Sequence, residues 1–180
     1  MERVGVVFEA SQKPTKGWVA PFTVVGEKPA WLRRRFVALP KGKNDHDDCE
    51  ADAPLPRVPC YLHAAFGEVT IVFDFKASFF QVSLPQGNRA SFRCRMETGM
   101  LVKHVRLPMG YKCSPGMLRT VARALAGDTA VMSSRCAALK SLKMRVWIDN
   151  IRTSGPRRGV EKRGRVATQN ARQCVATLGE

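Results

Sequence analysis

The sequence predicts an α+β fold in which an antiparallel sheet is backed by two helices. Three observations lead to this prediction. The run 69–75 is almost continuously apolar and β-branched up to an acid, as expected of a buried central strand. Two later stretches, 91–107 and 144–155, each contain two short β-type runs around a turn signal. Two further stretches, at about 115–127 and 160–178, place apolar residues at helical spacing.

The front of the chain predicts little regular structure. Residues 1–30 are interrupted by Pro and Gly, so they are expected to form loops with one short strand around Phe22–Val25. The run WLRRRFVAL at 31–39 predicts a strand with three consecutive arginines, which suits either a cationic cleft or a solvated basic face. An acidic, Pro-rich loop at 44–59 follows.

Both hairpins have a distinctive residue pattern. Residues 91–96 alternate apolar side chains with Arg93 and Arg95, which predicts a half-buried strand with a cationic outer face that turns at 98–99. The run MRVWIDNIRTSG predicts a second hairpin that turns at Asp149–Asn150, because this pair tolerates the positive φ of a type I′ turn.

The two helices have recognisable ends. Ser114 is placed to cap the first helix, Pro115 to occupy its first turn and Gly127 to end it. The second helix is expected to end at Gly179. The first helix should present one apolar stripe, made of Met117, Leu118, Val121 and Leu125.

Charge narrows the class of partner. The 180 residues include 30 Lys plus Arg against 15 Asp plus Glu, a formal net charge of +15. This surplus favours a polyanion, and nucleic acid is preferred to a membrane surface because no apolar run is long enough to span and the cations are scattered. Solubility is the alternative role of the charge. The N-terminus lacks a secretory signal pattern, so an intracellular location, cytoplasmic or nuclear, and reduced cysteines are expected.

One group of residues has the spacing of a zinc site. His46 and Cys49, then Cys60 and His63, form two ligand pairs separated by ten residues. The intervening prolines and acids also indicate an acidic, Pro-rich loop with incidental cysteines. Both interpretations stay open on the sequence.

Two acids stand out for catalysis. Asp74 ends the apolar strand, and Asp149 stands at the tip of the second hairpin. If these strands are neighbours, their carboxylates meet, and such a pair is costly unless a cation such as Mg²⁺ neutralises it. That arrangement suits in-line phosphoryl chemistry with two metal ions. The alternative is that Asp149 is only a turn residue and Asp74 only a strand terminator.

Three ordered motifs carry a resemblance. FDFKASFFQVSL, RLPMGYKCSPGMLRTVARAL and VWIDNIRTSG resemble, in this order, the catalytic strand, the Leu-Pro-x-Gly loop with its helix, and the catalytic hairpin of retroelement reverse transcriptases. RRRFVALPKGKND looks like the arginine-bearing fingers strand of that family. The amino-acid sequences of this strand and of the WIDN hairpin are similar to those of VIPER-type and LTR-type retrotransposon enzymes. The resemblance covers about residues 31–178.

The resemblance implies an RNA-directed DNA polymerase that uses Mg²⁺ or Mn²⁺, an RNA or DNA template-primer and a dNTP. Asp74 and Asp149 would be the catalytic metal ligands, with the backbone carbonyl of Phe75 and the side chain of Asn150 as further contacts. Phe79 would be an aromatic gate for the sugar, although core packing is the ordinary role of such a residue. Which of the three arginines would face the triphosphate is left open. The implied nucleotide-binding residues are Arg33, Arg34, Arg35, Phe79, Met109 and Gly110.

Some features depart from the family pattern. Asn150 stands where the family has a second hairpin aspartate, so metal affinity should fall. By resemblance, residues 1–66 would be partial fingers with the acidic loop and residues 67–180 a truncated palm, with a palm-like antiparallel sheet. The thumb and ribonuclease H segments would come from a longer parent. A catalytically inactive, basic nucleic-acid-binding remnant is the alternative function, and a zinc-bridged binding domain is a further one.

Overall fold

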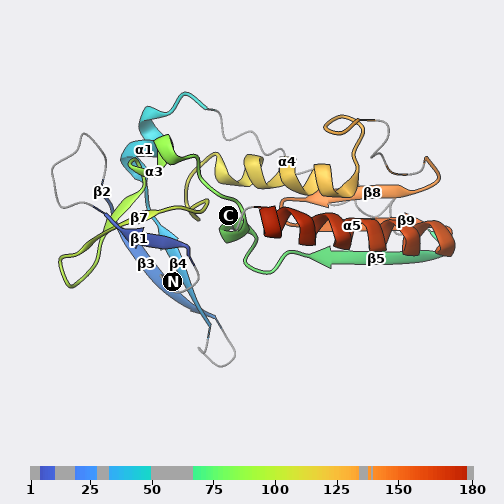
Figure 1. The fold of residues 1–180 in the computed structure, drawn as a ribbon, viewed down its shortest axis with the longest axis horizontal. Helices are drawn as coiled ribbons and strands as arrows, with labels where there is room; N and C mark the ends of the chain where they lie inside the picture. Colours follow the sequence, from blue (N-terminus) through green and yellow to red (C-terminus); the bar gives the residue numbers. More distant parts are fainter. Residues whose placement is uncertain are drawn as a thin grey trace. The chain divides into compact units, whose positions relative to one another are not determined.

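The computed structural model describes residues 5–10, 19–27, 33–49, 67–133, 138 and 140–177 (Figure 1). The chain forms two compact units, each built from two separate stretches. Unit 1 comprises Met1–Ala51 and Phe79–Ser114, and unit 2 comprises Asp52–Ser78 and Pro115–Glu180. The division predicted between residues 66 and 67 concerns subdomains of a family and stays a prediction.

Unit 1 contains a four-stranded sheet and a separate hairpin. The sheet has the order β1-β7-β6-β2, and its pairs are antiparallel except for the parallel pair of β2 and β6. The strands β3 and β4 lie where the patterns at 22–25 and 31–39 predict strands, and the structure pairs them antiparallel as a hairpin, which those patterns do not predict. The elements are β1 Val7–Glu9, β2 Val19–Ala20, β3 Phe22–Glu27, β4 Arg33–Ala38, α1 Lys41–His46, α3 Gln86–Arg89, β6 Arg93–Arg95 and β7 Leu101–His104. A 3-10 turn, η3, spans Ser78–Gln81.

The hairpin of β6 and β7 corrects one prediction about charge. Cys94 is fully buried, as the alternation predicts, but Arg93 is buried too, with 5% of its surface exposed. β6 is an inner strand, paired with β7 on one edge and β2 on the other, and neighbouring strands on both sides leave less solvent around a side chain than at a sheet edge. Only Arg95 of the expected cationic face is exposed.

Unit 2 is a three-stranded antiparallel sheet with two helices. The strands β5 Val69–Asp74, β8 Lys143–Trp147 and β9 Asn150–Gly155 have the order β5-β9-β8. The helices α4 Ser114–Ala126 and α5 Arg157–Thr177 lie where the two apolar stripes predict them. The predicted α+β class with an antiparallel sheet and two long helices is therefore confirmed.

The strand β5 differs from the prediction of a buried central strand. Within the described sheet it is an edge strand, and Val72 is 61% exposed. The side chains alternate: Phe73 joins the cluster formed by Ile151 of β9 with Ala122 and Ala126 of α4, whereas Val72 faces away from it. An apolar run of this length does not distinguish a strand covered on both faces from one covered on a single face.

The buried face of α4 is also shifted. Leu118, Ala122 and Ala126 are the buried positions, whereas Met117 and Val121 of the predicted stripe are exposed. The small alanines allow close packing against Ile151. No helix in the described part of the chain is long and apolar enough to cross a membrane.

Candidate functional site

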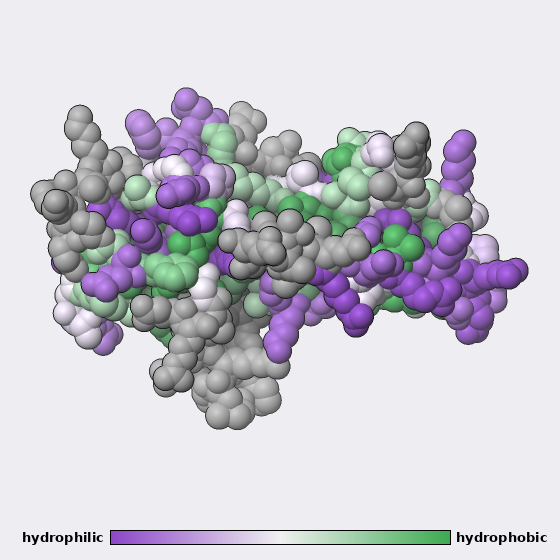
Figure 2. Space-filling view, in the orientation of Figure 1, coloured by the Kyte–Doolittle hydropathy of each residue, from purple (hydrophilic) through white to green (hydrophobic). Residues whose placement is uncertain are grey.

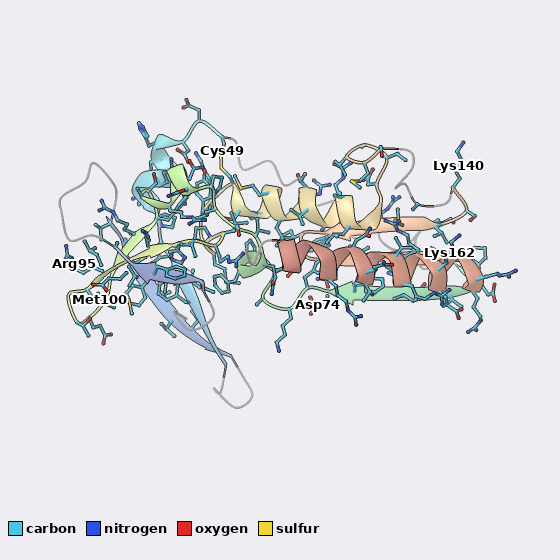
Figure 3. The ribbon with its side chains drawn as sticks, viewed as in Figure 1. Cys49, Asp74, Arg95, Met100, Lys140 and Lys162 are labelled. Carbon is cyan, nitrogen blue, oxygen red and sulfur yellow. A yellow bond between two sulfur atoms is a disulfide. The ribbon has the colours of Figure 1, made fainter. Side chains whose placement is uncertain are left out.

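The structure brings Asp74 and Asp149 to the same end of two neighbouring strands. Asp74 is the last residue of β5 and lies opposite Asn150, the first residue of β9. The ladder continues one step further, because the backbone N–H of Phe75 donates to the carbonyl oxygen of Asp149 over 3.2 Å. Asp74 is exposed at the end of β5 (Figure 3). Both acids therefore stand at one corner of the unit 2 sheet.

The hairpin turn that carries Asp149 is one residue earlier than predicted. Trp147 pairs with Asn150, so the two turn residues are Ile148 and Asp149. Ile148 has φ +38°, a left-handed conformation that is strained for a β-branched residue. Asn150 begins β9 instead of occupying the turn, because its pairing with Asp74 holds it in the ladder.

The Asp149 carboxylate accepts hydrogen bonds from two side chains among the described residues of this unit. The hydroxyl of Ser78 donates to Oδ2 over 3.2 Å, and the Asn150 amide donates to Oδ1 over 3.3 Å. Ser78 is buried and follows Ala77, which has φ +53°. Sequence reasoning missed Ser78, although its position as one of two small residues in the FDFKASFF motif was the available signal.

The donor set suits a hard cation. Two carboxylates at one corner, together with the oxygens of Ser78 and the local backbone, are the ligands that Mg²⁺ or Mn²⁺ prefers. No group of three or more His, Cys, Asp or Glu side chains within the described ranges is arranged to hold a metal. A divalent cation here would therefore depend on Asp74 and Asp149, with substrate or water completing its coordination.

The predicted nucleotide-binding residues lie in unit 1. Arg33, Arg34 and Arg35 follow one another on β4, where their backbone pairs with Gly26 and its neighbours, but their side chains lie outside the description. Phe79 is half-buried in η3, and Met109 is half-buried in the loop after β7. The two units are described separately, so these residues are not placed relative to Asp74.

Gly110 is required by its surroundings in unit 1. Its φ is +95°, and a Cβ at this position would overlap the carbonyl oxygen of Ala38. The amide of Asn44 donates to the Gly110 carbonyl over 3.0 Å, and the N–H of Lys112 donates to the Asn44 side chain over 3.0 Å. These contacts hold the 108–113 loop against α1 and the end of β4.

A second contact between the same elements perturbs two pKa values. The Tyr111 hydroxyl donates to Asp47 Oδ2 over 2.6 Å, and burial together with this carboxylate raises the pKa of Tyr111 to about 12. Burial alone would raise the pKa of Asp47. The hydrogen bonds from Lys43 and Tyr111 outweigh that effect and lower it.

One of the four candidate zinc ligands, Cys49, takes part in a disulfide bond. Cys49 is bonded to Cys113, with 6.7 Å between their Cα atoms, so a thiolate at Cys49 would require reduction of this bond. His46 is exposed at the end of α1, and Cys60 and His63 lie outside the described residues. The disulfide also differs from the expectation of reduced cysteines.

Comparison of this sequence with known proteins does not assign the chain to a family. No protein-family model matches the chain, and no curated protein matches it.

Proposed function

We propose that this chain is part of a reverse transcriptase, an RNA-directed DNA polymerase that transfers a nucleotide to a primer 3′-hydroxyl. The observation that carries the proposal is the meeting of Asp74 and Asp149 at one corner of the unit 2 sheet. The order of the three motifs supports it, because the first and third motifs supply these two acids.

In this proposal Asp74 and Asp149 hold the divalent cation. When bound, Mg²⁺ or Mn²⁺ lowers the pKa of the attacking hydroxyl and stabilises the leaving pyrophosphate. Ser78 orients the Asp149 carboxylate by donating to Oδ2, and the ladder bond from Phe75 fixes the turn beneath it. Asn150 brings an amide in place of a charge, so the chain should bind the cation more weakly than a site with three carboxylates.

The nucleotide-binding part of the proposal stands on the resemblance. Arg33, Arg34 and Arg35 would contact the triphosphate, Phe79 the sugar, and Met109 with Gly110 the base and backbone of the incoming dNTP. The partners are then a template-primer and a dNTP, and the expected location is intracellular. The thumb and ribonuclease H functions of the family would reside in other segments.

The test combines metal binding with primer extension by the 180-residue chain. Asp74→Asn and Asp149→Asn should each weaken Mn²⁺ binding, measured by electron paramagnetic resonance, and lower primer extension on an RNA template by about 100-fold or more. Asp45→Asn removes an exposed carboxylate in unit 1 and is the matched control. Undiminished Mn²⁺ binding and extension in Asp149→Asn would show that the assignment is wrong.

One observation favours a second function, nucleic-acid binding without catalysis. On the sheet face that carries Val72, Arg145 of β8 lies directly opposite Arg152 of β9, and Lys143 is two residues from Arg145 on the same face. Three cations on one face of a sheet offer charged donors that suit the phosphates of a nucleic acid. RNA binding that falls steeply with salt, weakens in Arg145→Gln and persists in Asp74→Asn would support this function over catalysis.

A further inference from the structure

The outer edge of β5 exposes backbone hydrogen-bonding groups. The bond from Phe75 N–H to Asp149 sets the alternation of the antiparallel ladder. Ile71 and Phe73 consequently direct their N–H and C=O groups toward β9, while those of Thr70 and Val72 point away from the sheet. No strand pairs with this edge in the described part of the chain. The strand has no proline, lysine or bulge of the kind that protects natural edges.

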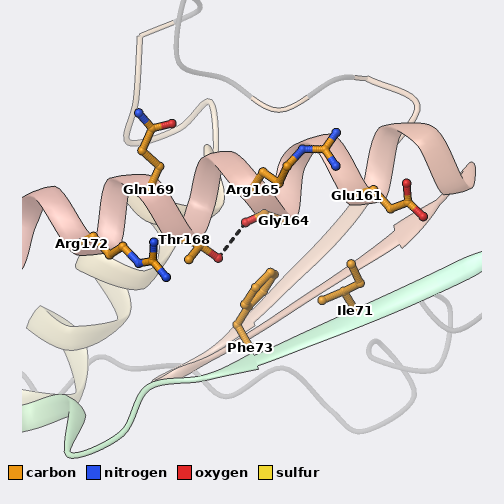
Figure 4. Close-up of a pocket in the computed structure, with 8 residues that line it drawn as sticks. All are labelled: Ile71, Phe73, Glu161, Gly164, Arg165, Thr168, Gln169 and Arg172. Carbon is orange, nitrogen blue, oxygen red and sulfur yellow. Dashed lines mark hydrogen bonds between the residues drawn. The ribbon is translucent and has the colours of Figure 1, made fainter.

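A groove follows this edge on the helix side of the sheet. Figure 4 shows Ile71 and Phe73 rising from β5 toward α5. Together with side chains of this helix they line an open groove of about 580 Å³. Gly164 permits this approach, because a Cβ there would lie 3.3 Å from Cζ of Phe73. The floor of the groove is therefore apolar and belongs to the same strand that offers the free backbone groups.

The rim of the groove is mainly cationic. Arg165 and Arg172 line it from α5 and are exposed, and Glu161 is the only acid among the described residues that line it. Figure 2 shows hydrophilic side chains gathered over the α5 side of unit 2. The helix begins beside the start of β5, where the N–H of Arg157 donates to Glu68 over 3.3 Å. The two arginines therefore lie further along, toward the Asp74 end.

We propose that the β5 edge and this groove form a docking site for an extended acidic and apolar peptide segment of a partner protein. The segment pairs antiparallel with Thr70 and Val72 through its backbone. Alternate side chains enter the groove above Ile71 and Phe73, and a carboxylate near the N-terminal end of the segment binds Arg165 or Arg172. A second copy of this chain is the less suitable occupant, because each copy carries a net charge of +15. The proposal is independent of the catalytic assignment.

The test uses a fluorescein-labelled heptapeptide, Thr-Glu-Thr-Ile-Thr-Val-Thr, and the 180-residue chain in a fluorescence anisotropy titration. The alternation directs Glu, Ile and Val to the groove. A control peptide carries N-methyl groups on its two central threonines, which removes backbone donors without changing charge. The unmodified peptide should bind about tenfold or more tightly than the methylated one. Equal affinity for the two peptides would overturn the proposal, because it would show attraction by net charge alone.

Protein variants test the two sides of the site. Reversing both rim charges, Arg165→Glu with Arg172→Glu, should weaken binding about tenfold or more, whereas Arg158→Glu on the same helix lies outside the groove and should change it less than about twofold. Val72→Pro removes an outward N–H that β9 does not use, and should weaken binding without altering the circular dichroism spectrum. If both helix variants weaken binding equally, or if sedimentation shows dimers that the peptide does not dissociate, the proposal is wrong. If Val72→Pro misfolds, the comparison of the unmodified and N-methylated peptides on the wild-type chain tests the backbone pairing instead.

Discussion

Acidification is expected to destabilise unit 1 through His104. This side chain is fully buried on β7 and packs with its ring centroid 5.3 Å from that of Phe36. Neither ring nitrogen has a hydrogen-bond partner among the residues that the structure describes. Burial lowers the pKa of His104 to about 4 from its usual 6.5. The folded state therefore keeps this imidazole neutral at a pH where the unfolded chain protonates it.

The sign and size of the effect follow from this difference in pKa. Between about pH 6.5 and pH 4 the unfolded state binds one more proton than the folded state, so the free energy of unfolding falls as pH falls. With the two pKa values of 6.5 and about 4, the loss between about pH 7 and pH 4.5 is roughly 2 kcal/mol. Above about pH 7 the contribution vanishes, because both states are neutral.

The assay compares the wild-type chain with His104→Phe, which keeps an aromatic ring beside Phe36. Urea unfolding at about pH 7 and pH 4.5 should show an additional loss of roughly 2 kcal/mol in the wild type that the variant lacks. The imidazole proton resonance of His104, identified by its absence in the variant, should not titrate above about pH 5. A resonance that titrates near pH 6.5, or equal losses in both proteins, would refute the reasoning.

Two further predictions concern the loop that packs on α1. Gly110→Ala should lower the free energy of unfolding by about 2–4 kcal/mol in urea titrations, because the new Cβ meets the Ala38 carbonyl and φ is +95°; a loss below about 0.5 kcal/mol would contradict this packing. Peptide mapping without reductant should recover Cys49 linked to Cys113, and replacing both by serine should cost about 4 kcal/mol by loop entropy for a separation of 64 residues. Recovery of both as free thiols would contradict the pairing.

Much of the secondary structure followed from local patterns. The strand ending at Asp74, the helix that begins at Ser114 and the hairpin at Asp149 all have strong signals within a few residues. The position of the hairpin turn was wrong by one residue, because the choice depends on the pairing of Asn150 with Asp74 and not on turn propensity.

Features that depend on contacts between distant parts of the chain were harder to predict from the sequence. The alternation predicts a solvent-facing Arg93, but this side chain is buried, and its strand is an inner strand because β6 also pairs with β2, a pairing that the local pattern does not indicate. The sequence predicts that Asp74 and Asp149 meet only if their two strands are neighbours, and sequence spacing alone does not determine which strands pair. The contribution of Ser78 required the three-dimensional position of its hydroxyl, for which a small residue in a motif is a weak signal.

The interleaving of the two units has a consequence for synthesis on the ribosome. The chain leaves one unit for the other after Ala51, after Ser78 and after Ser114. Asp74 of β5 is synthesised before its pairing partner, Asn150 of β9. The two residues are 150 minus 74, or 76, positions apart, which corresponds to about 4–15 s of elongation at typical rates. During that time the edge of β5 that pairs with β9 is open as well as its outer edge. Mispairing of this strand, rather than weakness of the finished sheet, is then the step at which a nascent chain is most exposed to aggregation and to chaperones.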